Sequence, residues 1–197
     1  DSEALEKDRS FETWFEEIDG ILIPGGFGQR GIEGMIRTVT IARTRGIPYF
    51  GICLGMQVMV IEYARSIMEL EEANSTEFSP DSPHPVVDLL EEQIDVTAFG
   101  GTMRLGRNDT KLLEGTKIRG SYNKELITER HRHRYEVSNK YRGAIQEAGL
   151  IVSGLTPDDA LVESVEWPEH PWGVGVQFHP EFKARPTAAH PLFVSFI

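Results

Sequence analysis

Short apolar runs alternate with helical periodicity in the first third of the chain. Residues 20–24 form a continuous apolar run that ends at Pro-Gly-Gly, which is typical of a strand buried on both faces. Apolar residues then recur at helical spacing over 32–45, before Gly and Pro stop this helix ahead of a second apolar strand at 49–52. Helices are also predicted over 11–17 and 54–67. This order predicts an α/β fold with a doubly wound, mostly parallel sheet and helices on both faces.

The middle of the chain has a different pattern. Residues 71–85 carry prolines among Ser, Asn and Asp, and we expect an irregular surface segment there. Short β-rich pieces separated by turns follow over 86–135, which predicts an antiparallel β-rich insertion. A helix over 140–148 and three strands complete the pattern, near 150–153, 161–165 and 173–178. We find no repeat, low-complexity tract or linker, so residues 1–197 are predicted to form one domain.

Composition narrows the function classes. The chain has 20 Lys and Arg against 31 Asp and Glu, a net charge of −11, which disfavours a nucleic-acid partner. A single cysteine excludes an internal disulfide framework and fits a reducing, cytoplasmic setting. The sequence has no apolar run of about 18 residues and begins with an acidic stretch, so neither a membrane nor export is indicated.

The only cysteine, Cys53, follows the second predicted strand and has Gly51 and Gly55 two residues to either side. This is the spacing of a nucleophile elbow, in which small flanking residues allow a sharp turn from strand to helix. At a helix N-terminus the unpaired N–H groups favour the thiolate, the form that attacks a carbonyl carbon. A lone cysteine is more often a small buried hydrophobe. The Gly-x-Cys-x-Gly context favours the nucleophile.

His179 stands where the last predicted strand ends, in His-Pro-Glu. Pro180 biases His179 toward an extended backbone, which would point the side chains of His179 and Glu181 to one side. A carboxylate at that distance orients an imidazole. An isolated His-Pro-Glu is more often an incidental surface motif, but together with the elbow it indicates a Cys-His-Glu triad.

A glycine-rich turn, residues 24–28, follows the first predicted strand. Such a turn can aim a backbone N–H at a developing oxyanion, and the N–H of Leu54, directly after Cys53, can supply a second donor. The alternative is a tight turn without chemistry. A phosphate loop is disfavoured because the spacing and the Lys-Ser/Thr ending are absent from this segment.

These three motifs together resemble class I glutamine amidotransferase domains. Three further segments, residues 74–78 (Asn-Ser-Thr-Glu-Phe), 101–106 (Gly-Thr-Met-Arg-Leu-Gly) and 130–136 (Arg-His-Arg-His-Arg-Tyr-Glu), are similar to the glutaminase domains of the CTP synthase family. The likeness spans nearly the whole chain. It implies hydrolysis of L-glutamine and delivery of ammonia to an N-terminal synthetase domain of the same polypeptide, which aminates ATP-activated UTP to CTP in pyrimidine nucleotide biosynthesis.

The resemblance implies a role for each site residue. Cys53 would attack the side-chain amide of glutamine, while His179, oriented by Glu181, protonates the departing ammonia and activates water against the thioester. Without the motif match, Glu77 and Arg134 would be interpreted as ordinary surface residues. The implied glutamine-site residues are Gly26 and Leu54 for the oxyanion, Gly55, Met56 and Gln57 as further contacts, Glu77 for the α-ammonium and Arg134 for the α-carboxylate.

The resemblance also implies GTP as an allosteric activator, Mg-ATP and UTP in the synthetase domain, no cofactor in this domain, and a homotetramer. Arginines gather at 104, 107, 130, 132 and 134, and Arg104 and Phe27 are the residues implied in GTP coupling. The alternative is that these arginines pair with surplus surface carboxylates. His131 and His133 suggest metal ligands, but the sequence places no third ligand, so no metal is predicted.

The chain also departs from the family pattern. In the family a strand-helix-strand segment precedes the region that corresponds to Asp1, and the apolar pattern at Ile197 is interrupted inside a predicted helix. We therefore expect a piece of a longer polypeptide with an exposed sheet edge. Two other function classes stay open. One is a different thiol hydrolase, such as a γ-glutamyl peptidase or a sibling amidotransferase, and the other is a non-catalytic regulatory or scaffold domain.

Overall fold

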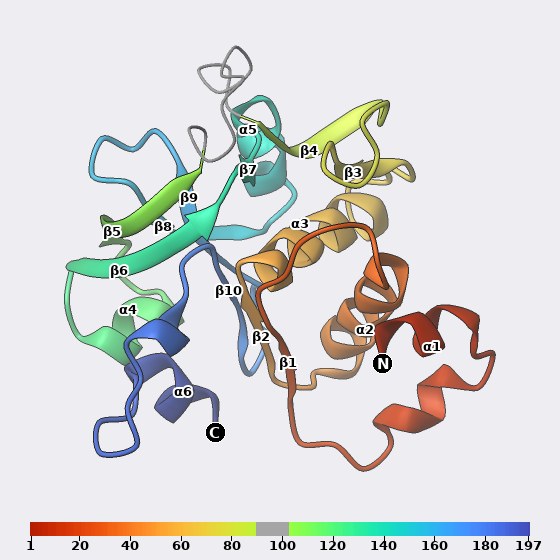
Figure 1. The fold of residues 1–197 in the computed structure, drawn as a ribbon, viewed down its shortest axis with the longest axis horizontal. Coiled ribbons are helices and arrows are strands. Elements are labelled where there is room, and N and C mark those ends of the chain that lie inside the picture. The colour runs from red at the N-terminus through yellow and green to blue at the C-terminus, as the bar shows by residue number, and fades with distance from the viewer. Residues whose placement is uncertain (90–102) are drawn as a thin grey trace.

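The computed structural model describes residues 1–89 and 103–197 (Figure 1). Within these ranges the main sheet has seven strands in the order β1-β2-β10-β9-β8-β5-β6, and a second sheet has three in the order β3-β4-β7. The strands are β1 (Ile21–Ile23), β2 (Tyr49–Ile52), β3 (Ala73–Ser75), β4 (His84–Leu89), β5 (Arg104–Leu112), β6 (Leu126–His133), β7 (Tyr135–Val137), β8 (Ile151–Leu155), β9 (Val162–Glu166) and β10 (Gly173–Val176).

Helices cover both faces of the main sheet, as the sequence predicts. The helices are α1 (Ser2–Lys7), α2 (Ile32–Arg45), α3 (Leu54–Ser66), α4 (Lys117–Tyr122), α5 (Asn139–Glu147) and α6 (Pro191–Phe196), with short 3-10 helices η1 (Phe11–Phe15) and η3 (Pro180–Phe182). Neighbouring residues of β2 belong to different cores, because strand side chains alternate between faces. Tyr49 belongs to the core formed with α2 and α3, and Phe50 to the core formed with α4 and α6. None of the described helices has the length and apolar character needed to cross a membrane.

The α/β class is confirmed, but the prediction of a mostly parallel sheet is wrong. β1 and β10 both run parallel to β2, whereas the pairs β10–β9, β9–β8, β8–β5 and β5–β6 are antiparallel. Parallel neighbours need a long crossover, usually a helix, and the loops that join β8 to β9 and β9 to β10 are too short for one.

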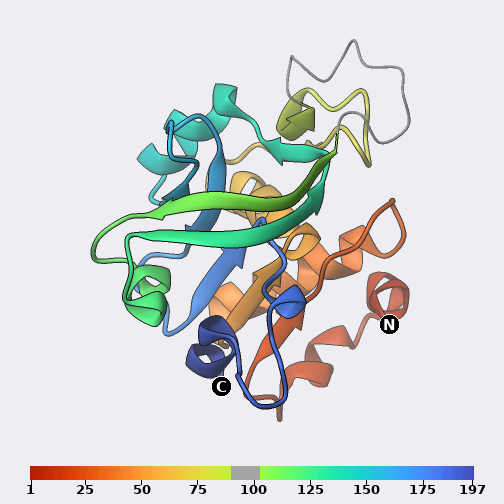
Figure 2. The ribbon, with the colours of Figure 1, turned by 60° about the vertical axis from the view of Figure 1, so that its left-hand side comes forward.

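The predicted antiparallel β-rich insertion is present in the described residues and contributes to both sheets, while residues 90–102 of that segment lie outside them. β5 and β6 are antiparallel, as predicted, but they pair over eight positions and extend the main sheet beside β8 (Figure 2). β4 and β7 instead join β3 in the second sheet. The segment 71–85, expected to be irregular, holds β3 and the beginning of β4. Its register shifts between Asn74 and Ser75, beside Pro85, where a proline without an N–H is tolerated.

The three parallel strands bring the sequence motifs together. Because β1, β2 and β10 are neighbours and run the same way, their carboxyl ends meet at one edge of the sheet. The glycine-rich turn follows β1, Cys53 follows β2 and His179 follows β10 by a few residues. The assignment of residues 1–197 to one domain of a longer polypeptide stays a prediction.

Candidate active site

Cys53 forms a sharp turn between β2 and α3. Its φ of 51° and ψ of −99° place a non-glycine residue in a strained region of the backbone map. The flanking glycines are required by close packing. A Cβ on Gly51 would lie 2.6 Å from the backbone of Gly55, and a Cβ on Gly55 would lie 2.3 Å from the carbonyl oxygen of Ile23. The geometry is the elbow that the Gly-x-Cys-x-Gly spacing predicts.

The sulfur of Cys53 lies in a buried and electronegative setting. Only 2% of the residue is exposed, and burial raises the pKa of the thiol, with Glu136, Glu181 and Glu77 adding to the rise. The Leu54 N–H lowers the pKa. The N–H at the helix N-terminus favours the thiolate, as expected, but desolvation outweighs it and sets the direction of the shift. The side-chain amide of Gln177 also faces the sulfur, with Nε2 at 3.7 Å from Sγ.

His179 is oriented by its neighbours on three sides. Its Nδ1 lies 2.6 Å from Oε1 of Glu181, as the motif predicts, and its backbone N–H donates to the Arg130 carbonyl. Its ring stacks on Phe182 with centroids 4.6 Å apart and planes 7° apart. On another side, a Cβ added to Gly25 would lie 2.6 Å from the ring carbon Cε1. The imidazole is thus fixed in plane and rotation.

The remaining ring nitrogen of His179 has the character of a base. A carboxylate only accepts, so the neutral imidazole carries its proton on Nδ1, toward Glu181, and presents Nε2 as an acceptor. Nε2 is buried and has no hydrogen-bond partner among the described residues. Sequence reasoning missed Phe182. Its signal was an aromatic residue three positions after His179, which a 3-10 turn such as η3 brings onto the same side.

Cys53 lies in the wall of a cavity of ≈ 270 Å³. Sequence reasoning named six of the nine lining residues as site residues, and the other three flank Arg104 or Arg134 in the chain. The cavity also contains Phe27, which is 56% exposed and has the Arg132 guanidinium 5.6 Å from its ring centroid. The lining residues are Gly26, Phe27, Cys53, Gln57, Glu77, Met103, His133, Arg134 and Tyr135.

Three residues assigned to the glutamine site do not line this cavity: Leu54, which is only 3% exposed, Gly55 and Met56. Met56 is fully buried, and a Cβ on Gly175 would lie 3.0 Å from its side chain. The carbonyl of Gly55 accepts a hydrogen bond from the Tyr49 hydroxyl at 2.7 Å. Gly55 and Met56 lie under the elbow, in the first turn of α3, and support it from within the core.

An acid and a cation lie in the same cavity as the thiol. Glu77 accepts a hydrogen bond from the Gly28 N–H at 2.8 Å, and burial raises the pKa of Glu77 while that N–H and Arg134 lower it. Gln57 donates through Nε2 to the Tyr135 carbonyl at 3.0 Å. The structure therefore gathers a nucleophile, an anion and a cation, which suits a substrate with an electrophilic carbon and both charges of a free amino acid.

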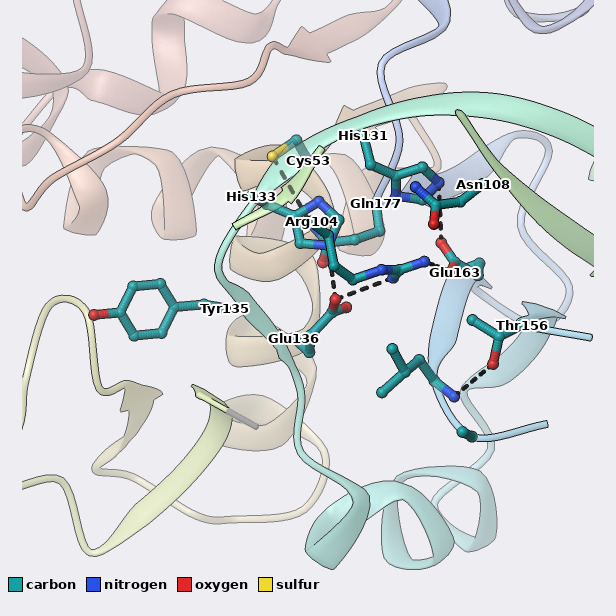
Figure 3. Close-up of polar contacts among 12 residues, drawn as sticks. Cys53, Arg104, Asn108, His131, His133, Tyr135, Glu136, Thr156, Glu163 and Gln177 are labelled. Carbon is teal, nitrogen blue, oxygen red and sulfur yellow. Dashed lines mark hydrogen bonds and ion pairs between the residues drawn. The ribbon is translucent and has the colours of Figure 1, made fainter. Parts of the chain in front are cut away.

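Arg104 is held in a buried ionic network with Glu136 and Glu163 (Figure 3). Its guanidinium contacts Glu136 at 3.0 Å and Glu163 at 2.7 Å, and only 15% of its side chain is exposed. Both carboxylates are buried, so the alternative of pairing with surface carboxylates is wrong for Arg104. Coupling to GTP stays a prediction for Arg104 and Phe27. Residues 101 and 102 of the predicted coupling loop lie outside the described residues.

His131 and His133 belong to the same network. His133 lies 2.8 Å from Glu136, and His131 lies 3.6 Å from Glu163. Burial, followed by the charge of Arg104, lowers the pKa of His131 to about 2, so this ring is neutral. Across residues 1–89 and 103–197, no group of three or more His, Cys, Asp and Glu side chains has the arrangement of a metal site.

Comparison with known proteins bears on the chemistry of this cavity. A family model described as glutamine amidotransferase class-I matches residues 1–197. CTP synthase of Carboxydothermus hydrogenoformans is 55% identical over 197 residues, which is 100% of this chain and 37% of that protein. CTP synthase of Methanothermobacter thermautotrophicus is 56% identical over 186 residues, 94% of this chain and 35% of that protein. This chain thus spans little more than a third of the length of these curated relatives.

Solved structures agree with these sequence relatives. The glutaminase domain of Trypanosoma brucei CTPS, with bound acivicin, superposes with a TM-score of 0.92 at 38% identity, over 100% of this chain and 76% of that one. A Thermoplasma acidophilum protein described as part of a GMP synthase superposes with a TM-score of 0.62 at 16% identity, over 94% of this chain and 74% of that one. The second likeness concerns the fold alone.

Proposed function

Because this chain belongs to the class I glutamine amidotransferase family, in the branch of CTP synthase glutaminase domains, we propose that it hydrolyses L-glutamine to glutamate and ammonia. The observation that carries the proposal is the placement of Cys53, at a strained elbow, in one cavity with Glu77 and Arg134. A non-catalytic scaffold would have no use for a strained nucleophile and an oriented histidine at the same edge of the sheet.

The proposed reaction uses the thiol at the elbow and the oriented histidine, and the elbow and the hydrogen bond to Glu181 support these roles. His179 takes the thiol proton at Nε2, and Sγ attacks the side-chain amide carbon of glutamine. The N–H groups of Gly26 and Leu54 stabilise the oxyanion. His179 returns the proton to the leaving nitrogen, so ammonia departs and a thioester remains. His179 then accepts a proton from water, the hydroxide attacks the thioester, and glutamate and the free thiol are released.

The charged groups of the cavity select a free amino acid. Glu77 would pair with the α-ammonium, and Arg134 with the α-carboxylate. A substrate that lacks the α-ammonium or the α-carboxylate leaves Glu77 or Arg134 without an opposite charge, and this weakens its binding. Burial raises the pKa of Glu77, and an ammonium ion beside it would favour its charged form.

The whole reaction requires a second domain. Relatives named CTP synthase are almost three times as long as the segment that this chain matches. We propose that the ammonia passes to an N-terminal synthetase domain that binds Mg-ATP and UTP and forms CTP. GTP as activator, Phe27 and Arg104 as coupling residues, a homotetramer and a cytoplasmic location belong to the same proposal.

Ammonia release tests the proposed function directly. The protein is expected to release ammonia from L-glutamine, and acivicin, which is bound in the Trypanosoma brucei relative, should block it. γ-Glutamyl peptides carry a substituted amide nitrogen and should be poor substrates. Faster release of amines from γ-glutamyl peptides than of ammonia from glutamine would favour a γ-glutamyl peptidase instead.

Arg134→Ala is expected to lower kcat/KM for glutamine by about 2 to 4 kcal/mol of transition-state free energy, mainly through a higher KM. The reason is that the substrate carboxylate loses its charge-assisted partner. Steady-state ammonia release at varied glutamine measures the change. Arg130→Ala removes an exposed arginine of the same segment and serves as the control. An unchanged KM for Arg134→Ala would remove this residue from the glutamine site.

Gly25→Ala is expected to lower kcat about 100-fold, because a misplacement of roughly 1 Å at a catalytic group has an effect of that size. The added Cβ would lie 2.6 Å from Cε1 of His179 and must displace the ring. Gly120→Ala is the matched control, since a Cβ at Gly120 meets nothing within 4 Å. Equal kcat in the two variants would show that His179 is not held against this turn.

A further inference from the structure

The thiolate of Cys53 needs hydrogen-bond donors that the proposed mechanism does not yet supply. Three carboxylates, Glu77, Glu136 and Glu181, oppose its charge, and the sulfur is almost fully buried. The Leu54 N–H favours the thiolate, but the mechanism turns this group toward the oxyanion. His133 and Arg134 line the same cavity, and Arg134 already has an assigned role toward the substrate.

A chain of amide groups ends at the sulfur, and its direction is fixed at the far end. The backbone carbonyl of Tyr135 only accepts hydrogen bonds, so Gln57 must present its NH₂ group there, at 3.0 Å. The same NH₂ group lies 3.5 Å from Gln177, which must therefore present its oxygen. The NH₂ group of Gln177 is then the one that faces Cys53 Sγ, at 3.7 Å (Figure 3). This order of donors and acceptors settles the orientation of both side-chain amides.

The surroundings of Gln177 hold this arrangement in place. The residue is completely buried, and its backbone N–H donates to the Glu163 carbonyl at 2.9 Å. It immediately follows β10, the strand whose Val176 carbonyl accepts the Cys53 N–H at 2.7 Å. The donor and the sulfur thus directly follow two neighbouring strands that are hydrogen-bonded to each other, and neither has to move for the contact to persist.

We propose that Gln177 is a further catalytic residue, whose side-chain amide donates a hydrogen bond to Cys53 Sγ and holds the sulfur as a thiolate when the proton leaves. The catalytic role of Gln177 rests on the proposed function, whereas its contact with Cys53 Sγ does not. Gln57 and the Tyr135 carbonyl orient the amide. A hydrogen bond to the charged form of a group favours that form, and nothing else in the mechanism supplies one to the sulfur throughout the reaction.

The test is the pH dependence of alkylation at Cys53 by iodoacetamide, measured without glutamine. The thiolate is the reacting form, so the rate follows its population. Mass spectrometry of the peptide that contains Cys53 reports this residue alone in the full-length protein. Gln177→Met keeps the length of the side chain and removes the donor. Its alkylation rate at pH 8 is expected to fall roughly tenfold, with the pH midpoint raised by about one unit.

The control is Thr110→Val, which alters another fully buried polar residue whose hydroxyl has no hydrogen-bond partner among the described residues. Its alkylation profile should match that of the unmodified protein. An unchanged profile in a folded Gln177→Met protein would overturn the inference. Should this variant not fold, the unmodified protein still decides the question. The NMR resonances of the Gln177 side-chain amide must shift at the pH midpoint of Cys53 alkylation. Resonances that do not change at this midpoint would overturn the proposal.

The outcomes separate this inference from the proposed function. A raised midpoint in Gln177→Met, in a protein that releases no ammonia from glutamine, supports the contact and contradicts the glutaminase proposal. Normal ammonia release by the unmodified protein, with an unchanged midpoint in Gln177→Met, contradicts only the role of Gln177. Gln177→Glu provides a further check. It is isosteric and adds a fourth carboxyl beside the sulfur, so its alkylation rate should fall below that of Gln177→Met.

Discussion

Cys53→Ala is expected to abolish glutamine-dependent activity, with a loss on the order of 10⁴-fold or more, while synthesis from added ammonia in the full-length protein persists. The thioester cannot form without the sulfur, whereas free ammonia bypasses this site altogether. Alanine keeps the Cβ and the positive φ of the elbow, so the turn itself should survive. The measurement compares CTP formation from glutamine with CTP formation from ammonium salts.

The same comparison separates a chemical role from a structural one. His179→Ala should resemble Cys53→Ala, because both the attack and the departure of ammonia need its Nε2. Glu181→Ala should be milder, since it removes only one of the contacts that hold the imidazole, and Phe182 still stacks on the ring. Equal loss of the glutamine and ammonia reactions in Cys53→Ala would mean that Cys53 supports the fold.

Local sequence signals predicted the elements that build the site. α2 spans Ile32–Arg45 as expected, because apolar periodicity defines the helix and Gly46 ends it with a φ of 68°. β2 spans Tyr49–Ile52, as its apolar run indicates. The elbow follows from the two glycines alone, since each has backbone where a Cβ would lie. In these segments the local pattern and the tertiary packing favour the same structure.

A local sequence pattern could not predict which strands pair or which side chains distant segments bury. β10 pairs with β2 across more than a hundred residues, and the antiparallel direction of β5, β8 and β9 depends on which strand each one meets. The raised pKa of the Cys53 thiol was likewise not predictable from the local sequence. A helix N-terminus predicts a thiolate, but the neighbours that bury Cys53 come from distant segments. The cavity that joins Glu77 to Arg134 was predicted by resemblance, and the contact of Gln177 with the sulfur was visible only in the structure.

Arg104→Met is expected to lower the free energy of unfolding by about 3 to 5 kcal/mol at pH 8, the range seen when one partner of a buried ion pair is removed. The buried carboxylates of Glu136 and Glu163 would both lose their cation. Lys111→Met, on the same strand, removes an exposed pair with Asp159 and should change the free energy of unfolding by less than about 1 kcal/mol. Denaturant unfolding measures both, and hydrogen exchange in β5 and β9 localises the loss. A loss of GTP stimulation in an Arg104 variant supports coupling only where this network stays folded.

The pH dependence of the loss in free energy of unfolding in Arg104→Met shows whether the charge of Glu163 contributes to it. Burial raises the pKa of Glu163 from its ordinary 4.5 to about 7, and Arg104 opposes this rise. Between these two pH values the folded chain binds more protons than the unfolded chain, so the free energy of unfolding falls as pH increases. Without Arg104 the pKa of Glu163 rises further, and the fall continues above pH 7. The difference between the unmodified protein and Arg104→Met should therefore be smaller at pH 5, where Glu163 is protonated and only the pair with Glu136 is lost, and largest at pH 8. An equal difference at both pH values would mean that Arg104 stabilises the fold through packing and through Glu136, with no contribution from the charge of Glu163.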